Sequence, residues 1–272
     1  MTPPMKNSFI CFVVLVCFVR CSSNKVQTDD SLEKFFKENG MEGSFGLFDN
    51  GTSRFTIYNL PRYRDSAYLP ASTFKIVNSL IGLQTGKIVD DSMVIKWDGI
   101  NRGREECNRD LSMYQAFRIS CPAWYQQLAR SIGKDTMQHW LDSLSYGNKK
   151  ISRIDTFWLD NSLKVRADEE LGLVKRLYFN QLPFHQRNQD IVKRAMLFED
   201  NTDYKLSYKT GWGRNEEGHH LAWITGWIVE NQHPYFFVLN IESKQMDADI
   251  PAIRMKILKG ILKQLGFLEG KK

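Results

Sequence analysis

The chain alternates hydrophobic and polar residues near its N-terminus and again in its last third, which predicts β-strands in both places. The N-terminal alternation lies on both sides of Asp49-Asn50-Gly51, a sequence typical of a hairpin turn. The predicted strand segments are residues 43–59, 205–213, 220–230 and 234–243. With a helical region between them, strands at both chain ends predict one antiparallel sheet to which both ends contribute.

Helical spacing of apolar residues dominates the middle of the chain, roughly residues 66–200, and predicts a separate helical lobe. A short first helix is expected within residues 31–40 and a longer last helix within residues 251–266. Loops are expected around residues 97–99, 146–148 and 155–163. The predicted fold is therefore α+β, an antiparallel sheet flanked by helices plus a helical lobe, with a ligand cleft between sheet and lobe.

An unbroken apolar run occupies residues 9–19 and is followed by Arg20. Because it is too short to span a bilayer, it is typical of a secretory signal. We predict a signal peptide over residues 1–21 and a single compact domain over residues 22–272, exported to the periplasm. Cys21 also raises the alternative of a lipoprotein, although Arg20 replaces the small residue expected before such a cysteine; a membrane attachment is expected only if Cys21 is acylated.

Composition changes this picture little. The chain is 42% hydrophobic and 25% charged, as in ordinary globular proteins, and its net charge of +6 is not gathered into basic blocks, so no nucleic-acid partner is expected. The five histidines lack metal-site spacing, which predicts no metal. Cys107 and Cys121 could pair in an oxidising compartment, but the sequence does not set their distance. The oligomeric state stays open.

Lys75 is the most unusual polar residue of the pattern, because the surrounding residues 69–83 are mostly apolar and contain no acid. Ser72 lies three residues earlier, so both side chains share one helix face. Burial disfavours a charged amine, and a neutral lysine can take the proton of a serine hydroxyl. The S-x-x-K spacing alone is weak, since it occurs four times here. The alternative is a capping serine and a lysine that reaches solvent.

A second motif, Lys209-Thr210-Gly211, lies on a predicted strand and is the only K-T-G of the chain. The two motifs in this order are the pairing of serine β-lactamases and penicillin-binding proteins. The sequence resembles the class D (oxacillinase-type) serine β-lactamases over essentially the whole mature chain. The further segments that carry the resemblance are Lys96-Trp97-Asp98-Gly99, Tyr146-Gly147-Asn148 and residues 156–165.

The resemblance implies a β-lactamase/penicillin-binding transpeptidase-like fold and hydrolysis of small-molecule β-lactam substrates, which confers antibiotic resistance. Ser72 would form the acyl-enzyme. Lys75 would be an N6-carboxylysine and act as general base, so carbon dioxide or bicarbonate would be needed, without any other cofactor or metal. Trp158 would donate its indole N–H to the modified lysine.

The resemblance also assigns the remaining site residues. Ser120 would pass a proton to the leaving nitrogen, and the backbone N–H groups of Ser72 and Trp212 would form the oxyanion hole. The substrate carboxylate would be held by Lys209, Thr210, Gly211 and Arg254.

Three residues depart from the family pattern. Pro122 stands where the family usually has the valine of S-x-V that covers the modified lysine, and Arg104 and Cys107 replace larger apolar residues. The cleft rim is therefore expected to be more polar. Two alternatives remain, a non-hydrolysing β-lactam sensor and a penicillin-binding domain, and the substrate spectrum stays open.

Overall fold

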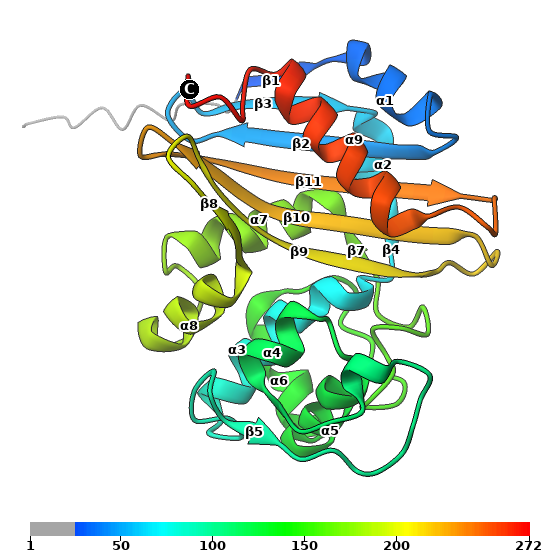
Figure 1. The fold of residues 1–272 in the computed structure, drawn as a ribbon, viewed down its shortest axis with the longest axis vertical. Helices are drawn as coiled ribbons and strands as arrows, with labels where there is room; N and C mark the ends of the chain where they lie inside the picture. Colours follow the sequence, from blue (N-terminus) through cyan, green and yellow to red (C-terminus); the bar gives the residue numbers. More distant parts are fainter. Residues whose placement is uncertain (1–24) are drawn as a thin grey trace, which may run out of the picture.

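The computed structural model describes residues 25–272. The predicted signal peptide, residues 1–21, and the candidate acylation site Cys21 lie outside the described residues. Within the described chain, a seven-stranded sheet has helices on both faces, and a helical lobe adjoins one side of it (Figure 1). This is the predicted α+β arrangement.

The sheet has the strand order β1-β3-β2-β11-β10-β9-β8. Its strands are β1 (Lys25–Thr28), β2 (Glu42–Asp49), β3 (Arg54–Tyr58), β8 (Leu197–Asp200), β9 (Lys205–Arg214), β10 (His220–Glu230) and β11 (His233–Ser243). β2 pairs with β11, with Leu47 opposite Phe237, so the two ends of the chain meet in one sheet as predicted. The strand pairs of this sheet are antiparallel, except that β1 pairs with β3 in parallel.

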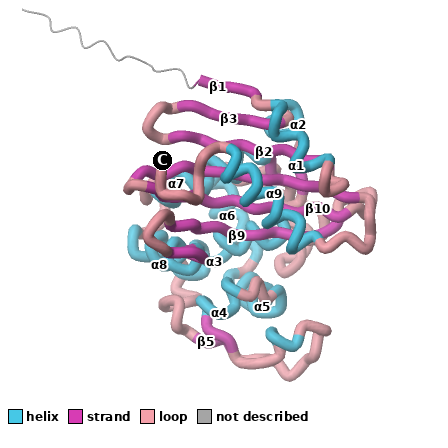
Figure 2. The backbone as a smooth tube through the Cα atoms, turned by 45° about the horizontal axis from the view of Figure 1, so that its top comes forward, coloured by secondary structure: helices cyan, strands magenta, loops and turns pink. Residues whose placement is uncertain are grey.

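Successive side chains of β11 face opposite sides of the sheet, as strand geometry requires. Phe236 and Val238 pack into the core beneath the helical lobe, whereas Phe237 and Leu239 pack against the helices on the other face. Those helices are α1 (Glu33–Lys37), which follows a short 3-10 turn η1 (Asp30–Leu32), and α9 (Ile250–Gln264). Both faces of the central strands are therefore buried, and Figure 2 shows α9 lying across the strands.

The middle of the chain is helical, as predicted, and forms the lobe with only short strands. The helices between β3 and β8 are α2 (Leu60–Asp65), η2 (Ala71–Phe74), α3 (Lys75–Gln84), η3 (Glu105–Cys107), α4 (Met113–Arg118), α5 (Pro122–Ile132), α6 (Lys134–Leu144), α7 (Ala167–Tyr178) and α8 (Gln186–Met196). Of these, α2 and α7 pack against the sheet. Two small antiparallel pairs join β4 (Ala67–Tyr68) to β7 (Val165–Arg166) and β5 (Val94–Ile95) to β6 (Leu111–Ser112).

The contact between sheet and lobe that positions the site is that of β9 with η2. A Cβ atom added at Gly211 of β9 would lie 2.7 Å from the Pro70 carbonyl oxygen and 3.4 Å from the Ser72 nitrogen. Only glycine permits this approach. Because β8 pairs with β9 only from Lys205 to Ser207, the rest of this side of β9 is free to meet η2.

Candidate active site

Ser72 and Lys75 lie at the junction of η2 and α3, and the structure brings their side chains together as predicted. The Lys75 amine donates a hydrogen bond to the Ser72 hydroxyl, with 2.6 Å between Nζ and Oγ. The helix that carries Lys75 is buried from Lys75 through Leu83. A helix that is apolar on nearly every side is expected to be buried in this way. The serine and the lysine are therefore the first pair of the site.

Lys75 is buried to 1% exposure, and its burial, aided by the nearby positive charge of Arg104, lowers the pKa of the amine to about 7. The ring of Tyr125 lies beside it, with its centroid 5.3 Å from Nζ. The phenol oxygen of Tyr125 in turn contacts Ser79 Oγ at 2.8 Å. A large fraction of Lys75 is accordingly neutral at pH 7, the form that accepts a proton.

Trp158 is fully buried in the loop between α6 and β7, and its ring stacks on Phe74 with 5.3 Å between centroids. Its backbone oxygen accepts a hydrogen bond from the Ala71 N–H at 3.0 Å, which ties this loop to η2. The indole Nε1 is buried and has no hydrogen-bond partner among the described residues. Buried donors are rarely left unpaired, so this N–H fits an acceptor that the bare protein does not supply.

Ser120 follows α4, and its hydroxyl accepts a hydrogen bond from Lys209 Nζ at 3.0 Å. Lys209 lies on β9 and is also fully buried. Burial and the positive charges of Lys75, Arg254 and Arg104 hold the pKa of the Lys209 amine well below its ordinary value. The lysine of the second motif thus meets the predicted proton donor, although 89 residues separate them.

Arg254 enters the site from α9, and its Nη1 donates to the Gly211 carbonyl at 2.8 Å. Burial lowers the pKa of its guanidinium to about 10, so it remains charged at neutral pH. Trp212, the next residue of β9, leaves 45% of its surface exposed at the rim, where its indole N–H donates to His220 Nδ1 at 3.1 Å.

These residues surround a cleft of about 630 Å³, a size typical of small-molecule sites. Lys75, Trp158 and Lys209 are buried and are not part of its lining. The lining consists of Ser72, Arg104, Arg118, Ile119, Ser120, Pro122, Leu159, Thr210, Gly211, Trp212, Pro251 and Arg254. No carboxylate belongs to this lining in the described part of the chain, so the cleft attracts anions.

Sequence reasoning missed one buried acid at the site, Glu170. Glu170 is fully buried on α7 and accepts hydrogen bonds from Thr73 of η2 at 2.9 Å and from Tyr146 at 2.7 Å. Burial raises the pKa of its carboxyl group to about 7. In the sequence it is one of three consecutive acids at a helix start, where acids are common, so no signal distinguished it.

Cys107 and Cys121, whose pairing the sequence left undecided, form a disulfide with Cα atoms 5.7 Å apart. Pro122, the departure at the expected valine position, is the first residue of α5 and lines the cleft. Within residues 25–272 no group of histidine, cysteine, aspartate or glutamate side chains is arranged to hold a metal ion.

The comparisons with known proteins agree with this geometry. Residues 37–263 match the family model of the penicillin binding protein transpeptidase domain. The chain is 37% identical over 239 residues to β-lactamase OXA-48 of Klebsiella pneumoniae. This alignment covers 88% of this chain and 89% of that relative. The chain belongs to the class D serine β-lactamases. Its resemblance to that class is thereby confirmed.

Solved structures support the same assignment and the β-lactamase fold. The class D β-lactamase YbXI from Nostoc superimposes on this class D enzyme with a TM-score of 0.83 at 36% identity, over 88% of this chain and all of that one. The C-terminal domain of the Bacillus licheniformis BlaR penicillin receptor superimposes with a TM-score of 0.84 at 30% identity, over 89% of this chain and 97% of that domain.

Proposed function

We propose that this class D β-lactamase hydrolyses β-lactam antibiotics through an acyl-enzyme on Ser72 and thereby confers β-lactam resistance. The observation that carries the proposal is the 2.6 Å contact between Lys75 Nζ and Ser72 Oγ, at a lysine whose pKa is lowered to about 7. A neutral amine at this distance can take the hydroxyl proton as Ser72 attacks the lactam carbonyl.

The second part of the proposal is that Lys75 is carboxylated on Nζ by carbon dioxide or bicarbonate, with no metal and no other cofactor. Carbon dioxide combines only with the unprotonated amine, and burial supplies that form. Two observations support an anionic group here: the unpartnered N–H of Trp158, whose ring stacks on Phe74 directly before Lys75, and the positive charge of Arg104 near Lys75. The carboxylated amine would supply the general base for acylation and for hydrolysis of the acyl-enzyme.

The remaining residues are assigned by chemistry and position. The backbone N–H groups of Ser72 and Trp212 would bind the developing oxyanion, as preorganised donors do in acyl transfer. Ser120, which Lys209 contacts at 3.0 Å, would pass a proton to the leaving nitrogen. Arg254 remains charged, and with Lys209, Thr210 and Gly211 it would hold the carboxylate of the substrate.

Export to the periplasm is proposed from the sequence, with a signal peptide over residues 1–21 and acylation of Cys21 as the alternative. The Cys107–Cys121 disulfide supports an oxidising compartment. Within residues 25–272, no helix combines the length and apolar character needed to cross a bilayer.

A β-lactam sensor is the second candidate, because the similarity to the BlaR receptor domain favours it. This chain is 32% identical to the regulatory protein BlaR1 of Bacillus licheniformis but covers only 38% of its length. An enzyme and a sensor would both acylate Ser72. They differ in whether the acyl group is then released.

The test is to count the molecules of a chromogenic cephalosporin opened per protein molecule, with and without added bicarbonate. We expect many turnovers, a higher rate with bicarbonate, and no reaction in Ser72→Ala. A single burst of one equivalent, unaffected by bicarbonate, would refute hydrolysis and support the sensor. Turnover that bicarbonate leaves unchanged in carbon dioxide-free buffer would refute only the carboxylation of Lys75.

A further inference from the structure

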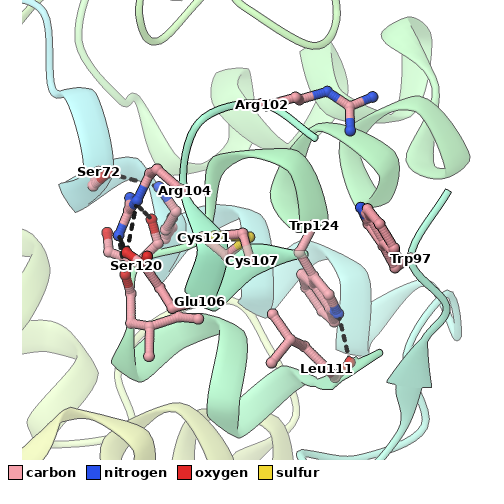
Figure 3. Close-up of a disulfide and its surroundings, with 12 residues drawn as sticks. Ser72, Trp97, Arg102, Arg104, Glu106, Cys107, Leu111, Ser120, Cys121 and Trp124 are labelled. Carbon is pink, nitrogen blue, oxygen red and sulfur yellow. Dashed lines mark hydrogen bonds and ion pairs between the residues drawn. A yellow bond between two sulfur atoms is a disulfide. The ribbon is translucent and has the colours of Figure 1, made fainter. Parts of the chain in front are cut away.

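The loop segment 104–107 lies against the turn that carries Ser120. Arg104 donates from Nη2 to the Ile119 carbonyl at 2.9 Å and from Nη1 to the Ser120 carbonyl at 3.2 Å. Figure 3 shows this guanidinium beside Ser120, whereas Arg102 of the same loop points away from the turn. One side chain thus binds both carbonyls at the exit of α4.

Those carbonyls need a donor because of how α4 ends. Ser120 adopts a left-handed conformation with φ of 58°, which is unfavourable for a residue other than glycine. Its N–H bonds to the Phe117 carbonyl at 3.1 Å, and the Cys121 N–H bonds to the Ala116 carbonyl at 2.9 Å. This is the pattern of a Schellman motif, whose last carbonyls have no partner within the helix.

A covalent link holds the same turn. Cys121, the residue after Ser120, is joined by the disulfide to Cys107, three residues after Arg104. Glu106 completes the attachment, since its carboxylate accepts from Arg104 Nη2 at 2.6 Å and from Nε at 2.9 Å and so fixes the orientation of the guanidinium. Two residues of the loop, Arg104 and Cys107, thus bind residues 119–121, by hydrogen bonds and by a covalent bond.

We propose that Arg104 and the Cys107–Cys121 disulfide are positioning residues that hold the Ser120 hydroxyl at Lys209 and at the cleft, so that the rate of acylation depends on them. The left-handed turn at Ser120 is unfavourable on its own, and these contacts oppose its relaxation together with the two backbone hydrogen bonds of the turn. Relaxation would move the hydroxyl out of the 3.0 Å contact with Lys209. The inference rests on the proposed role of Ser120 in acylation.

The experiment compares acylation and deacylation rates in Arg104→Met, in the double variant Cys107→Ala/Cys121→Ala and in the reduced wild type. A displacement of about 1 Å in a catalytic group can cost about a hundredfold in rate. We expect acylation to fall tenfold to a hundredfold, with the dissociation constant of the noncovalent substrate complex and the deacylation of a preformed acyl-enzyme changed far less. An equal fall in deacylation would overturn the proposal, because it would show that the charge of Arg104 acts through Lys75. Arg104→Lys, which can still reach one carbonyl, should restore part of the rate.

Arg102→Met is the matched control. Arg102 belongs to the same loop and forms an ion pair with Asp98 at 2.6 Å, without contact to the Ser120 turn. Its loss should leave acylation unchanged. Circular dichroism melts of each variant establish that folding persists. If the cysteine variant does not fold, Arg104→Met still tests the proposal, because it retains the disulfide.

Repeating Arg104→Met in a Ser120→Ala background decides whether Arg104 acts through Ser120. If it does, Arg104→Met should cause no further loss of acylation once the hydroxyl is absent, whereas an effect of its charge on Lys75 would persist in that background. An unchanged acylation rate in Arg104→Met alone, or the same fractional loss in the Ser120→Ala background, would overturn the proposal. Because acylation is measured directly, a wild type that acylates without turnover would refute hydrolysis and still leave this test valid.

Discussion

Lys75, which directly follows η2, and Glu170, which bonds to Thr73 of η2, are both buried, and burial shifts their pKa values in opposite directions. The amine falls to about 7 from 10.5, and the carboxyl group rises to about 7 from 4.5. In both cases burial is the largest cause, since a desolvated site disfavours whichever form is charged. Near neutral pH, each residue thus has a large uncharged fraction.

Glu170 should make the unfolding free energy depend on pH. Between pH 4.5 and 7 the folded protein keeps this proton while the unfolded chain releases it, so stability falls as pH rises through that window, by on the order of 3 kcal/mol. Glu170→Gln resembles the neutral acid in donors and acceptors. Urea unfolding should therefore show that the unfolding free energy falls less between pH 5 and pH 8 in the variant than in the wild type. At pH 8 the variant should be more stable than the wild type.

The same experiment can contradict this account. An equal loss of stability between pH 5 and pH 8 in wild type and Glu170→Gln would mean that the carboxyl group does not keep its proton in the folded state. Lys75 makes stability rise with pH, but only above about pH 7. Its pKa is lower in the folded than in the unfolded protein, so above that pH the folded protein releases a proton that the unfolded chain keeps.

A substitution of Trp158 tests the proposed carboxylation of Lys75 without reference to activity. Trp158→Phe keeps the ring against Phe74 and removes the unpartnered N–H. A hydrogen bond to a charged group contributes about 1.5–3 kcal/mol, so carbon dioxide binding should weaken about tenfold to a hundredfold. The measurement is the carbamate signal of ¹³C-bicarbonate-loaded protein by NMR. Trp140→Phe is the control, because this partly buried ring stacks on Phe184. Equal carbamate signals in Trp158→Phe and wild type would contradict the role of Trp158.

At the level of elements, Pro122 begins α5 at a position where proline is favourable. The first helical N–H has no partner within a helix, and the fixed φ of proline suits this position. Pro122 therefore shapes the cleft without disturbing the helix that follows.

Pro122→Val should lower the unfolding free energy by about 0.4–1 kcal/mol, because the unfolded chain gains conformational freedom. Acylation should persist, since neither the backbone of α5 nor the Ser120 turn depends on the ring. Denaturant unfolding with a parallel acylation assay measures both. A loss of several kcal/mol would show that the ring has a packing role beyond its backbone effect.

The approach of β9 to η2 can be tested at Gly211. A side chain there would lie 2.7 Å from the Pro70 oxygen, which is tighter than real Cβ contacts. Gly211→Ala should separate the strand from Ser72 and lower kcat/KM by about a hundredfold.

Gly172→Ala on α7 is the control for this substitution. An added Cβ there meets no atom within 4 Å, so activity should be unchanged and stability should rise by about 0.5–1 kcal/mol. Full activity in Gly211→Ala would contradict the close approach that the structure gives.

For the molecule as a whole, the sequence predicted the elements with strong local patterns. The strand predicted over residues 220–230 has the bounds of β10, and those of β11 and α9 differ by one or two residues. β8 and the two-residue strands went unpredicted, because such short segments carry no periodicity. The parallel pairing of β1 depends on which strand it meets in space, and local sequence does not encode that.

The residues of the candidate site likewise fall into those that the sequence predicted and those that only the fold reveals. Ser72 and Lys75 are a helix turn apart, so spacing alone placed them together, and the K-T-G motif supplied Lys209 through the family resemblance. The contacts of Arg104 with the Ser120 turn and the burial of Glu170 come from residues distant in sequence. The sequence marked Arg104 only as a polar departure from the family pattern, and without the fold nothing distinguishes Glu170 from a surface charge.

The most direct test of the central claim is intact-mass spectrometry of the protein mixed with a penicillin and sampled over time. The account predicts an adduct of the mass of the whole penicillin, absent in Ser72→Ala. This adduct should disappear once the substrate is consumed, while hydrolysed product exceeds one equivalent per protein. An adduct that persists after free penicillin is removed, with product never exceeding one equivalent, would contradict hydrolysis at Ser72.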